Sequence, residues 1–165
     1  MKSISLWFFS VSLLVSACGT AGERYQQASV RVTDGQPCFS LGSSPGGSDA
    51  FPVLSSVRVD ERVEGVARNI WEADFLDRGD VELSPDECIP YAKGEPDPAP
   101  ELVPGRAYSV TILADVKAGE RFTARWYSAH FCMLETGQGL LSHQIEAGGR
   151  SDASGWAACG TGVRW

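Results

Sequence analysis

The clearest alternation of apolar and polar positions in the chain runs over Arg106–Val116. Apolar side chains occupy every second position there: Tyr108, Val110, Ile112, Ala114 and Val116. A period of two is typical of a strand with one buried face, so we expect a core strand here. Lys117–Glu120 is a tight connection to Arg121–Met133, an aromatic-rich run. The two runs together predict a β-hairpin.

A second hairpin is predicted near the start of the chain. The dipeptide Asp34-Gly35 lies between two strand-like runs, Ala28–Thr33 and Gln36–Leu41. Asp-Gly is favoured in two-residue hairpin turns because both positions need a positive φ. After a loop rich in Gly, Ser and Pro, the alternation over Phe51–Asp60 predicts a half-buried antiparallel strand.

The remaining segments are shorter or less regular. Val66–Leu76 fits helical spacing as well as a strand, and we favour the strand because its neighbours are strands and no helix cap precedes it. Cys88–Tyr91 predicts a short strand, and the proline-rich Lys93–Pro104 predicts an irregular crossover. Gly137–Gly155 predicts a polar, glycine-rich excursion, and Trp156–Trp165 a last edge strand.

Seven or eight short strands at this spacing predict an all-β protein, a small immunoglobulin-like antiparallel β-sandwich. We expect a single domain over residues 28–165, with a C-terminal extension from about residue 134. The chain without residues 1–17 has a comfortable size for one domain with its own core, and we expect no second domain.

The residues before Cys18 carry a targeting pattern. Lys2 precedes an apolar stretch, Ile4–Val15, of roughly 12 residues, which is short of the about 20 that a membrane-spanning helix needs. With Val15-Ser16-Ala17-Cys18 it resembles a bacterial lipoprotein signal peptide that ends in a lipobox. The resemblance implies removal of residues 1–17 and attachment of lipid, a diacylglycerol with palmitate-like acyl chains, to Cys18.

An anchor of this kind holds a protein at the membrane without any protein segment entering the bilayer. Gly19, which follows the lipobox cysteine, resembles the outer-membrane sorting pattern and implies a domain in the periplasm. Residues 18–27 are polar and predict the lipidated N-terminus and a short tether. The alternative is an ordinary secretory signal with a cysteine near its cleavage point.

The chain has five cysteines, and removal of Cys18 from the count leaves an even set in an oxidising compartment: Cys38, Cys88, Cys132 and Cys159. Two disulfides are expected, with three possible connectivities. We favour Cys38 with Cys88 and Cys132 with Cys159, because each pair lies within one half of the mature chain. A metal site that includes His130 and Cys132 is the alternative, although the chain has no Cys-x-x-Cys spacing.

Removing 17 residues from 165 leaves a mature chain of 148, and the net charge of −7 becomes about −8 through the loss of Lys2. This acidity argues against nucleic acid or anionic lipid as a partner. It fits a basic protein partner, or a surface that keeps the domain soluble.

The sequence offers little catalytic chemistry. His130 and His143 have no neighbouring nucleophile or carboxylate in a recognised arrangement, so we expect a structural His130 and a solvated His143, and no enzyme. No cofactor motif and no metal motif is present. An acidic run suggests either calcium ligands or, as we favour, a solvated turn: Asp74, Asp77, Asp80 and Glu82. Four tryptophans are candidates for a stacking platform or for the core: Trp71, Trp126, Trp156 and Trp165.

Three segments carry a resemblance to a known family when they are taken with the lipobox: Val32-Thr33-Asp34-Gly35-Gln36-Pro37-Cys38-Phe39-Ser40, Glu87-Cys88-Ile89-Pro90-Tyr91 and Tyr108-Ser109-Val110-Thr111-Ile112. Together they resemble the type VI secretion system immunity periplasmic lipoproteins. The resemblance implies a Cys38–Cys88 disulfide and a role in protecting a cell against a secreted effector toxin. It assigns no functional site, and it ends after about Phe131.

Immunity proteins act by binding, so the resemblance implies occlusion of a toxin by one face or loop of the domain. We expect the contact surface on the Gly137–Gly155 excursion or the Lys93–Pro104 crossover, because loops on a rigid scaffold present specificity. The alternative is a cell-envelope module that binds peptidoglycan or another saccharide through Trp126, Trp156 or neighbouring aromatic residues.

Overall fold

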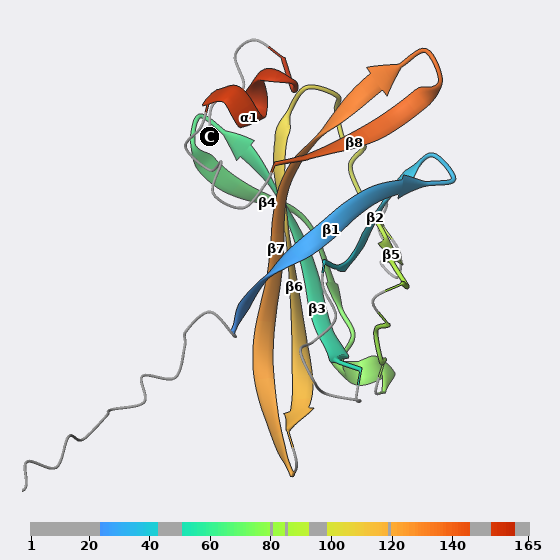
Figure 1. Ribbon diagram of the computed structural model, residues 1–165, viewed down its shortest axis with the longest axis vertical. Coiled ribbons are helices and arrows are strands. Elements are labelled where there is room, and N and C mark those ends of the chain that lie inside the picture. The colour runs from blue at the N-terminus through green and yellow to red at the C-terminus, as the bar shows by residue number, and fades with distance from the viewer. Residues whose placement is uncertain are drawn as a thin grey trace, which may run out of the picture.

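The structure is a computed structural model, and it describes residues 24–42, 51–79, 81–84, 86–92, 99–118, 120–145 and 153–160 (Figure 1). The predicted signal peptide, Cys18 and Gly19 lie outside these residues. In chain order the elements are β1 (Tyr25–Thr33), β2 (Gln36–Leu41), β3 (Val53–Val63), β4 (Val66–Asp74), the 3-10 helix η2 (Leu76–Arg78), β5 (Ile89–Pro90), β6 (Ala107–Ala118), β7 (Arg121–Thr136), β8 (Gly139–Ile145) and α1 (Ala153–Ala157). The prediction of an all-β protein is confirmed.

Two tight hairpins start the fold. Between β1 and β2, Asp34 and Gly35 have φ of 54° and 77°, as expected for a two-residue turn that follows the twist of the strands. Glu64 and Gly65 make the same kind of turn between β3 and β4, with φ of 51° and 82°. The second hairpin settles Val66–Leu76 as a strand as far as Asp74, because β4 pairs with β3 along its length.

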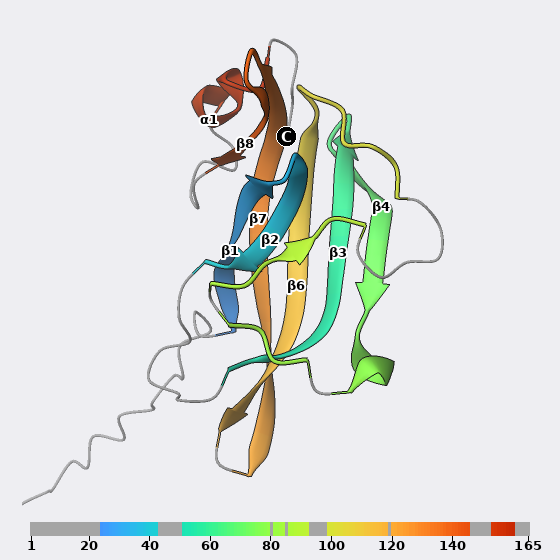
Figure 2. The same cartoon turned by 90° about the vertical axis from the view of Figure 1, so that its right-hand side faces the viewer.

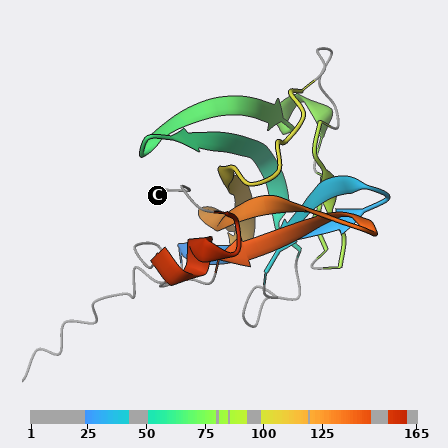
Figure 3. The ribbon, with the colours of Figure 1, turned by 90° about the horizontal axis from the view of Figure 1, so that it is seen from above.

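The strands follow one hydrogen-bonded path, β4-β3-β6-β7-β1-β2-β5, with β8 paired to β7. β1 joins two parts of this path: Tyr25–Gln27 pair in parallel with β7, and Ala28–Thr33 pair antiparallel with β2. The sheet therefore curls over, and β1, β2 and β5 lie across the face of β3, β6 and β7 (Figures 2 and 3).

Side chains of β8 complete the hydrogen bonding of β1 where β1 leaves β7. The backbone N–H of Val30 donates to Gln144 Oε1 at 2.8 Å, and Gln144 Nε2 donates to the Ala28 carbonyl at 2.9 Å. Ser142 Oγ donates to the Val30 carbonyl at 3.0 Å. These bonds satisfy backbone groups that would otherwise be costly to leave unpaired.

The core lies between the two layers. Phe39 of β2 is fully buried and packs against Phe131 of β7, with ring centroids 5.8 Å apart, and against Trp71 of β4 at 6.3 Å. Tyr91, which follows β5, meets both Phe39 and Trp71 edge to face, at 6.3 and 5.2 Å. Burial and edge-on aromatic contacts of this kind make Phe39 the centre of the two-layer region.

One corner resembles a feature of immunoglobulin-like domains. At the start of β6, the Tyr108 hydroxyl accepts a hydrogen bond from Val103 N at 2.8 Å and donates to the Val103 carbonyl at 3.3 Å. A tyrosine that bonds back to the chain just before its strand is typical of the immunoglobulin fold. This corner supports the immunoglobulin-like sandwich, which stays a prediction.

Three boundaries differ from expectation. β1 begins at Tyr25, whereas the tether was predicted to extend to residue 27 and the domain to begin at residue 28, because pairing with β7 orders these polar residues. The prediction of an irregular excursion over Gly137–Gly155 is wrong for Gly139–Ile145, because this segment pairs with β7 as the strand β8. The prediction of a last edge strand over Trp156–Trp165 is wrong at its first residues, because Trp156 lies in α1. Residues 161–165 lie outside the described part of the chain.

Candidate binding pocket

A pocket of about 300 Å³ opens where four parts of the chain meet. It is lined by the β1–β2 turn, the end of β5, the crossover and the β7–β8 hairpin: Gly35, Gln36, Pro37, Tyr91, Ala92, Ala99, Pro100, Glu101, Leu102, Met133 and Leu140. We call it the crossover pocket. Its buried wall is apolar, through Pro37, Leu102 and Met133. This volume is at the lower end of ligand sites, so the pocket suits one apolar side chain or another small group.

Tyr91 holds the crossover against the core. Its backbone N–H donates to the Pro37 carbonyl at 2.8 Å, and its hydroxyl donates to the Pro100 carbonyl at 2.8 Å. Burial, with a smaller effect of Tyr108, raises the pKa of Tyr91 to about 12. The phenol is therefore protonated at neutral pH and acts as a hydrogen-bond donor rather than as a base.

The far wall of the pocket is held by the Tyr108 corner. Leu102, which lines the pocket, directly precedes Val103, the residue that Tyr108 bonds at both its N–H and its carbonyl. The carbonyl of Met133 accepts a hydrogen bond from Gly105 N at 2.9 Å, which ties the end of the crossover to β7. The lining residues thus rest on regular strands, which preorganises the pocket.

A buried carboxylate lies beside this corner. Glu61 of β3 is buried opposite Tyr108 and accepts hydrogen bonds from Arg68 and Arg106. Burial raises the pKa of Glu61, but the hydrogen bonds and charges of Arg106 and Arg68 outweigh it and hold the pKa below its usual 4.5. Each oxygen of Glu61 accepts a hydrogen bond from one of the two arginines, so the carboxylate is paired within the protein and its role is structural.

The predicted acidic run lies at another corner. Asp74 accepts a hydrogen bond from Leu76 N, at the start of η2, at 2.9 Å. Asp74, Asp77 and Glu82 are exposed, and Asp80 lies outside the described residues. Within the described part of the chain no group of three acidic, histidine or cysteine side chains could hold a metal ion. A hollow of about 280 Å³ nearby is lined by Leu54, Phe75, Val81, Glu82, Leu83, Glu87, Cys88 and Ile89.

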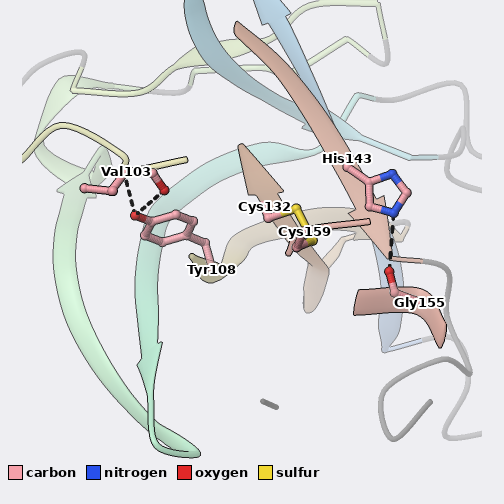
Figure 4. Close-up of a disulfide and its surroundings, with 6 residues drawn as sticks. All are labelled: Val103, Tyr108, Cys132, His143, Gly155 and Cys159. Atoms are coloured by element: carbon pink, nitrogen blue, oxygen red, sulfur yellow. Dashed lines mark hydrogen bonds between the residues drawn. A yellow bond between two sulfur atoms is a disulfide. The ribbon is translucent and has the colours of Figure 1, made fainter. Parts of the chain in front are cut away.

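Neither histidine lines the crossover pocket. His130 is partly buried on β7, opposite Ser109 of β6 and Ile145 of β8. His143 was expected to be a solvated loop residue, and that was wrong: it lies on β8, half-buried, with Nε2 3.3 Å from the Gly155 carbonyl (Figure 4).

The structure contains the connectivity that the sequence favoured. Cys38 is bonded to Cys88 and Cys132 to Cys159, with Cα atoms 5.5 and 5.9 Å apart. The second bond ties the residues after α1 to β7 (Figure 4). Trp156 packs there in a small cluster with Ala107, Cys132, Ile145 and Cys159. The cysteines are consumed as disulfides, so they are not thiolate ligands.

The tryptophans divide between core and surface. Trp71 and Trp156 are buried, whereas Trp126 is partly exposed and stacks on Tyr25 with ring centroids 5.5 Å apart. Trp165 lies outside the described residues. Trp71 and Trp156 are therefore core residues, and the alternative that they belong to a stacking platform is wrong.

Two features of the pocket were not found from the sequence. Met133 and Pro37 lie in predicted strands, and their side chains are buried, so nothing in their local pattern separates them from other core residues. Their signal is tertiary, because only the curl of the sheet brings β2 and β7 to one wall.

Comparison with known proteins adds nothing to this geometry: no protein-family model, curated protein or solved structure matches the chain. Among the described residues, no helix has the length and apolar character that crossing a membrane would require. The function must therefore be argued from the residues of the chain itself.

Proposed function

We propose that this protein is a non-catalytic periplasmic lipoprotein, anchored through Cys18 to the outer membrane, that binds and neutralises a secreted toxin, as type VI secretion system immunity proteins do. No cofactor or nucleic acid takes part. The partner is a secreted effector, and the crossover pocket is the site that receives it.

One observation carries the proposal. The two segments expected to form the contact surface, the crossover and the region after β7, meet at a single pocket, through Ala99–Leu102 and Leu140. An apolar pocket ringed by exposed loop residues is the setting in which one inserted side chain contributes most of a binding energy. Only Tyr91 and Glu101 ionise among the described lining residues, which favours binding over catalysis.

The chain offers a matched pair of variants for the test. Leu140 lines the pocket, and its neighbour Leu141 is 52% exposed and points to the other side of β8. The oxidised chain is immobilised and incubated with secreted proteins of the source strain, and a recovered protein is identified by mass spectrometry. That protein is then expressed in the periplasm of a susceptible cell, with and without this chain.

We expect one stoichiometric secreted protein whose toxicity this chain suppresses. Leu140→Arg should weaken the binding by about tenfold or more, and Leu141→Arg should leave it within about twofold. Equal loss in both variants would reject the crossover pocket. Recovery of cell-wall fragments alone would replace the proposal with the envelope-binding alternative.

A further inference from the structure

The β6–β7 hairpin projects beyond the rest of the sheet (Figures 1 and 2). Phe122 is 62% exposed near its tip, and Trp126 lies four residues further along β7 on the same face. Tyr25, 68% exposed, stacks on Trp126 with the ring planes 24° apart. Together Phe122, Trp126 and Tyr25 place three aromatic side chains at one end of the sheet, and exposed apolar groups that gather in this way mark an interaction surface.

Basic side chains gather at the same place. Lys117 pairs with Phe122 and so lies on the face of Phe122 and Trp126, whereas Arg121, at the tip, and Arg125 lie on the opposite face of the same hairpin. The carbonyl of Arg24 accepts a hydrogen bond from Trp126 N at 2.8 Å, which brings Arg24 to the same strand. We call this surface the hairpin end, and it comprises Arg24, Tyr25, Lys117, Arg121, Phe122, Arg125 and Trp126.

The charge of the hairpin end is opposite to that of the remaining described residues. It holds four basic side chains, and Asp115 and Glu120 are the acidic residues within the described part of residues 115–126. Elsewhere in the described chain acidic residues outnumber basic ones two to one: Asp34, Asp60, Glu61, Glu64, Glu72, Asp74, Asp77, Glu82, Asp86, Glu87, Glu101 and Glu135 against Arg31, Arg58, Arg62, Arg68, Arg78 and Arg106. This polarity would turn the hairpin end toward an anionic surface and the rest of the protein away from it.

The tether is short enough to keep the hairpin end within reach of the membrane that would hold the lipid anchor. Five residues lie between Cys18 and Arg24, and the six steps from one to the other span about 20 Å at most in an extended chain. A lipid on Cys18 would therefore keep the start of β1, and the Trp126 beside it, close to the headgroups. This step depends on the lipid anchor of the proposed function.

We propose that the hairpin end docks on the anionic phospholipid surface of the membrane that holds the lipid anchor. The aromatic rings of Phe122, Trp126 and Tyr25 lie at the headgroup level, and the basic side chains bind lipid phosphates. The net charge of the chain argued against anionic lipid, but a net charge does not report how the charges are distributed. Docking leaves the crossover pocket, which Met133 lines near the opposite end of β7, facing the periplasm.

The experiment uses the lipidated full-length chain in vesicles whose acyl chains are brominated. One set of vesicles contains phosphatidylglycerol, and the other contains phosphatidylcholine alone. Bromine quenches tryptophan only near the bilayer, and the difference between the native chain and Trp126→Phe isolates the signal of Trp126. Mass spectrometry of the N-terminal peptide reports independently whether Cys18 carries lipid.

We expect quenching of Trp126 in phosphatidylglycerol vesicles and its loss at high salt. Lys117→Gln and Arg121→Gln should each lower the ratio of docked to undocked chains about fivefold. Phe122→Ser should lower it further, while Leu76→Ser, a control at a residue that is 68% exposed, should leave it unchanged.

Three results would overturn docking while the anchor stands. They are an unquenched Trp126 on anchored chains, quenching that is equal in phosphatidylcholine, and a Trp126 response to peptidoglycan fragments with none to vesicles. If Cys18 carries no lipid, the anchor of the proposed function fails. Flotation of the unlipidated chain with phosphatidylglycerol vesicles then tests the hairpin end alone, and docking is rejected if Lys117→Gln and Arg121→Gln do not reduce flotation.

Discussion

Apolar and polar residues alternate along most of β6 and β7, but the two ends of this strand pair have different surroundings. At one end β1, β2 and β5 cross over them, and Tyr108, Tyr127 and Phe131 are buried. At the other end the hairpin projects past the second layer, and Phe122 is exposed. Alternation of apolar and polar residues therefore predicts a strand with two distinct faces. Whether one of these faces is part of the core or is exposed depends on whether a second layer of strands covers it.

The largest expected contrast between the two regions is in stability. Phe39→Ala should lower the free energy of unfolding by about 3–5 kcal/mol, because the ring is fully buried among Trp71, Tyr91 and Phe131. Phe122→Ala at the hairpin end should change it by less than about 0.5 kcal/mol. Denaturant unfolding of both variants measures the contrast, and similar costs would show that the projecting hairpin belongs to the same packed unit.

Both disulfides stabilise the end of the molecule where β1, β2 and β5 cover β6 and β7, so their removal should affect that end and not the projecting hairpin. Cys38–Cys88 spans 50 residues, and replacing both cysteines by alanine should cost about 4 kcal/mol. Cys132–Cys159 spans 27 residues, and its removal should cost roughly 0.5 kcal/mol less in the chain-entropy account. Unfolding of the oxidised variants in denaturant gives both values. A loss below about 1 kcal/mol for the first pair would mean that packing alone holds β5 on β2.

Glu61 tests the electrostatic support of the corner beside the pocket. Glu61→Gln should cost roughly 1–3 kcal/mol at neutral pH, which is less than for a fully buried pair because Arg68 and Arg106 are partly exposed. The pKa of Glu61 is lowered in the folded state, so its contribution is complete above pH 4.5 and is lost as the pH falls through the folded value. Unfolding measured above and below pH 4.5 should show a smaller acid loss in Glu61→Gln than in the native chain. An equal loss in both would assign it to other carboxylates.

Tyr91 gives the smallest expected effect. Tyr91→Phe removes the hydrogen bond to the Pro100 carbonyl and should cost about 1 kcal/mol. Because burial raises the pKa of Tyr91 to about 12, the protonated phenol stabilises the fold below pH 10, and this contribution is lost as the pH rises toward 12. Thermal unfolding across that range should show a shallower alkaline decline in the variant. If toxin binding also weakens while the fold stays intact, the crossover is part of the pocket in function as well as in geometry.

Local signals predicted much of the fold. A two-residue hairpin turn requires a positive φ at both positions, which Asp-Gly tolerates, and the turn forms at Asp34-Gly35. β6 forms where the alternation was strongest, because an alternating pattern can bury one face only as a strand. The even set of four cysteines likewise fitted two disulfides.

The candidate pocket was predicted only as two loop segments. β8 was expected to be part of a loop, because Gly137–Gly155 as a whole is polar and rich in glycine, a residue with little strand preference. Its strand state comes from pairing with β7, and Gln144 and Ser142 then bond to β1. The turn at Glu64-Gly65 was not predicted, because glutamate is not among the residues that favour a positive φ in a two-residue hairpin turn.

Local patterns in the sequence were enough for the all-β class, the β1–β2 and β6–β7 hairpins and the two disulfides, because alternation and turn chemistry act between neighbours in the chain. The tertiary structure decided that β1 starts at Tyr25, that Trp156 lies in α1, and that Leu102 and Leu140 face one pocket. It also separated the basic hairpin end from an otherwise acidic protein. These features depend on contacts between residues far apart in the chain, and no local pattern records which distant strand will cover a face.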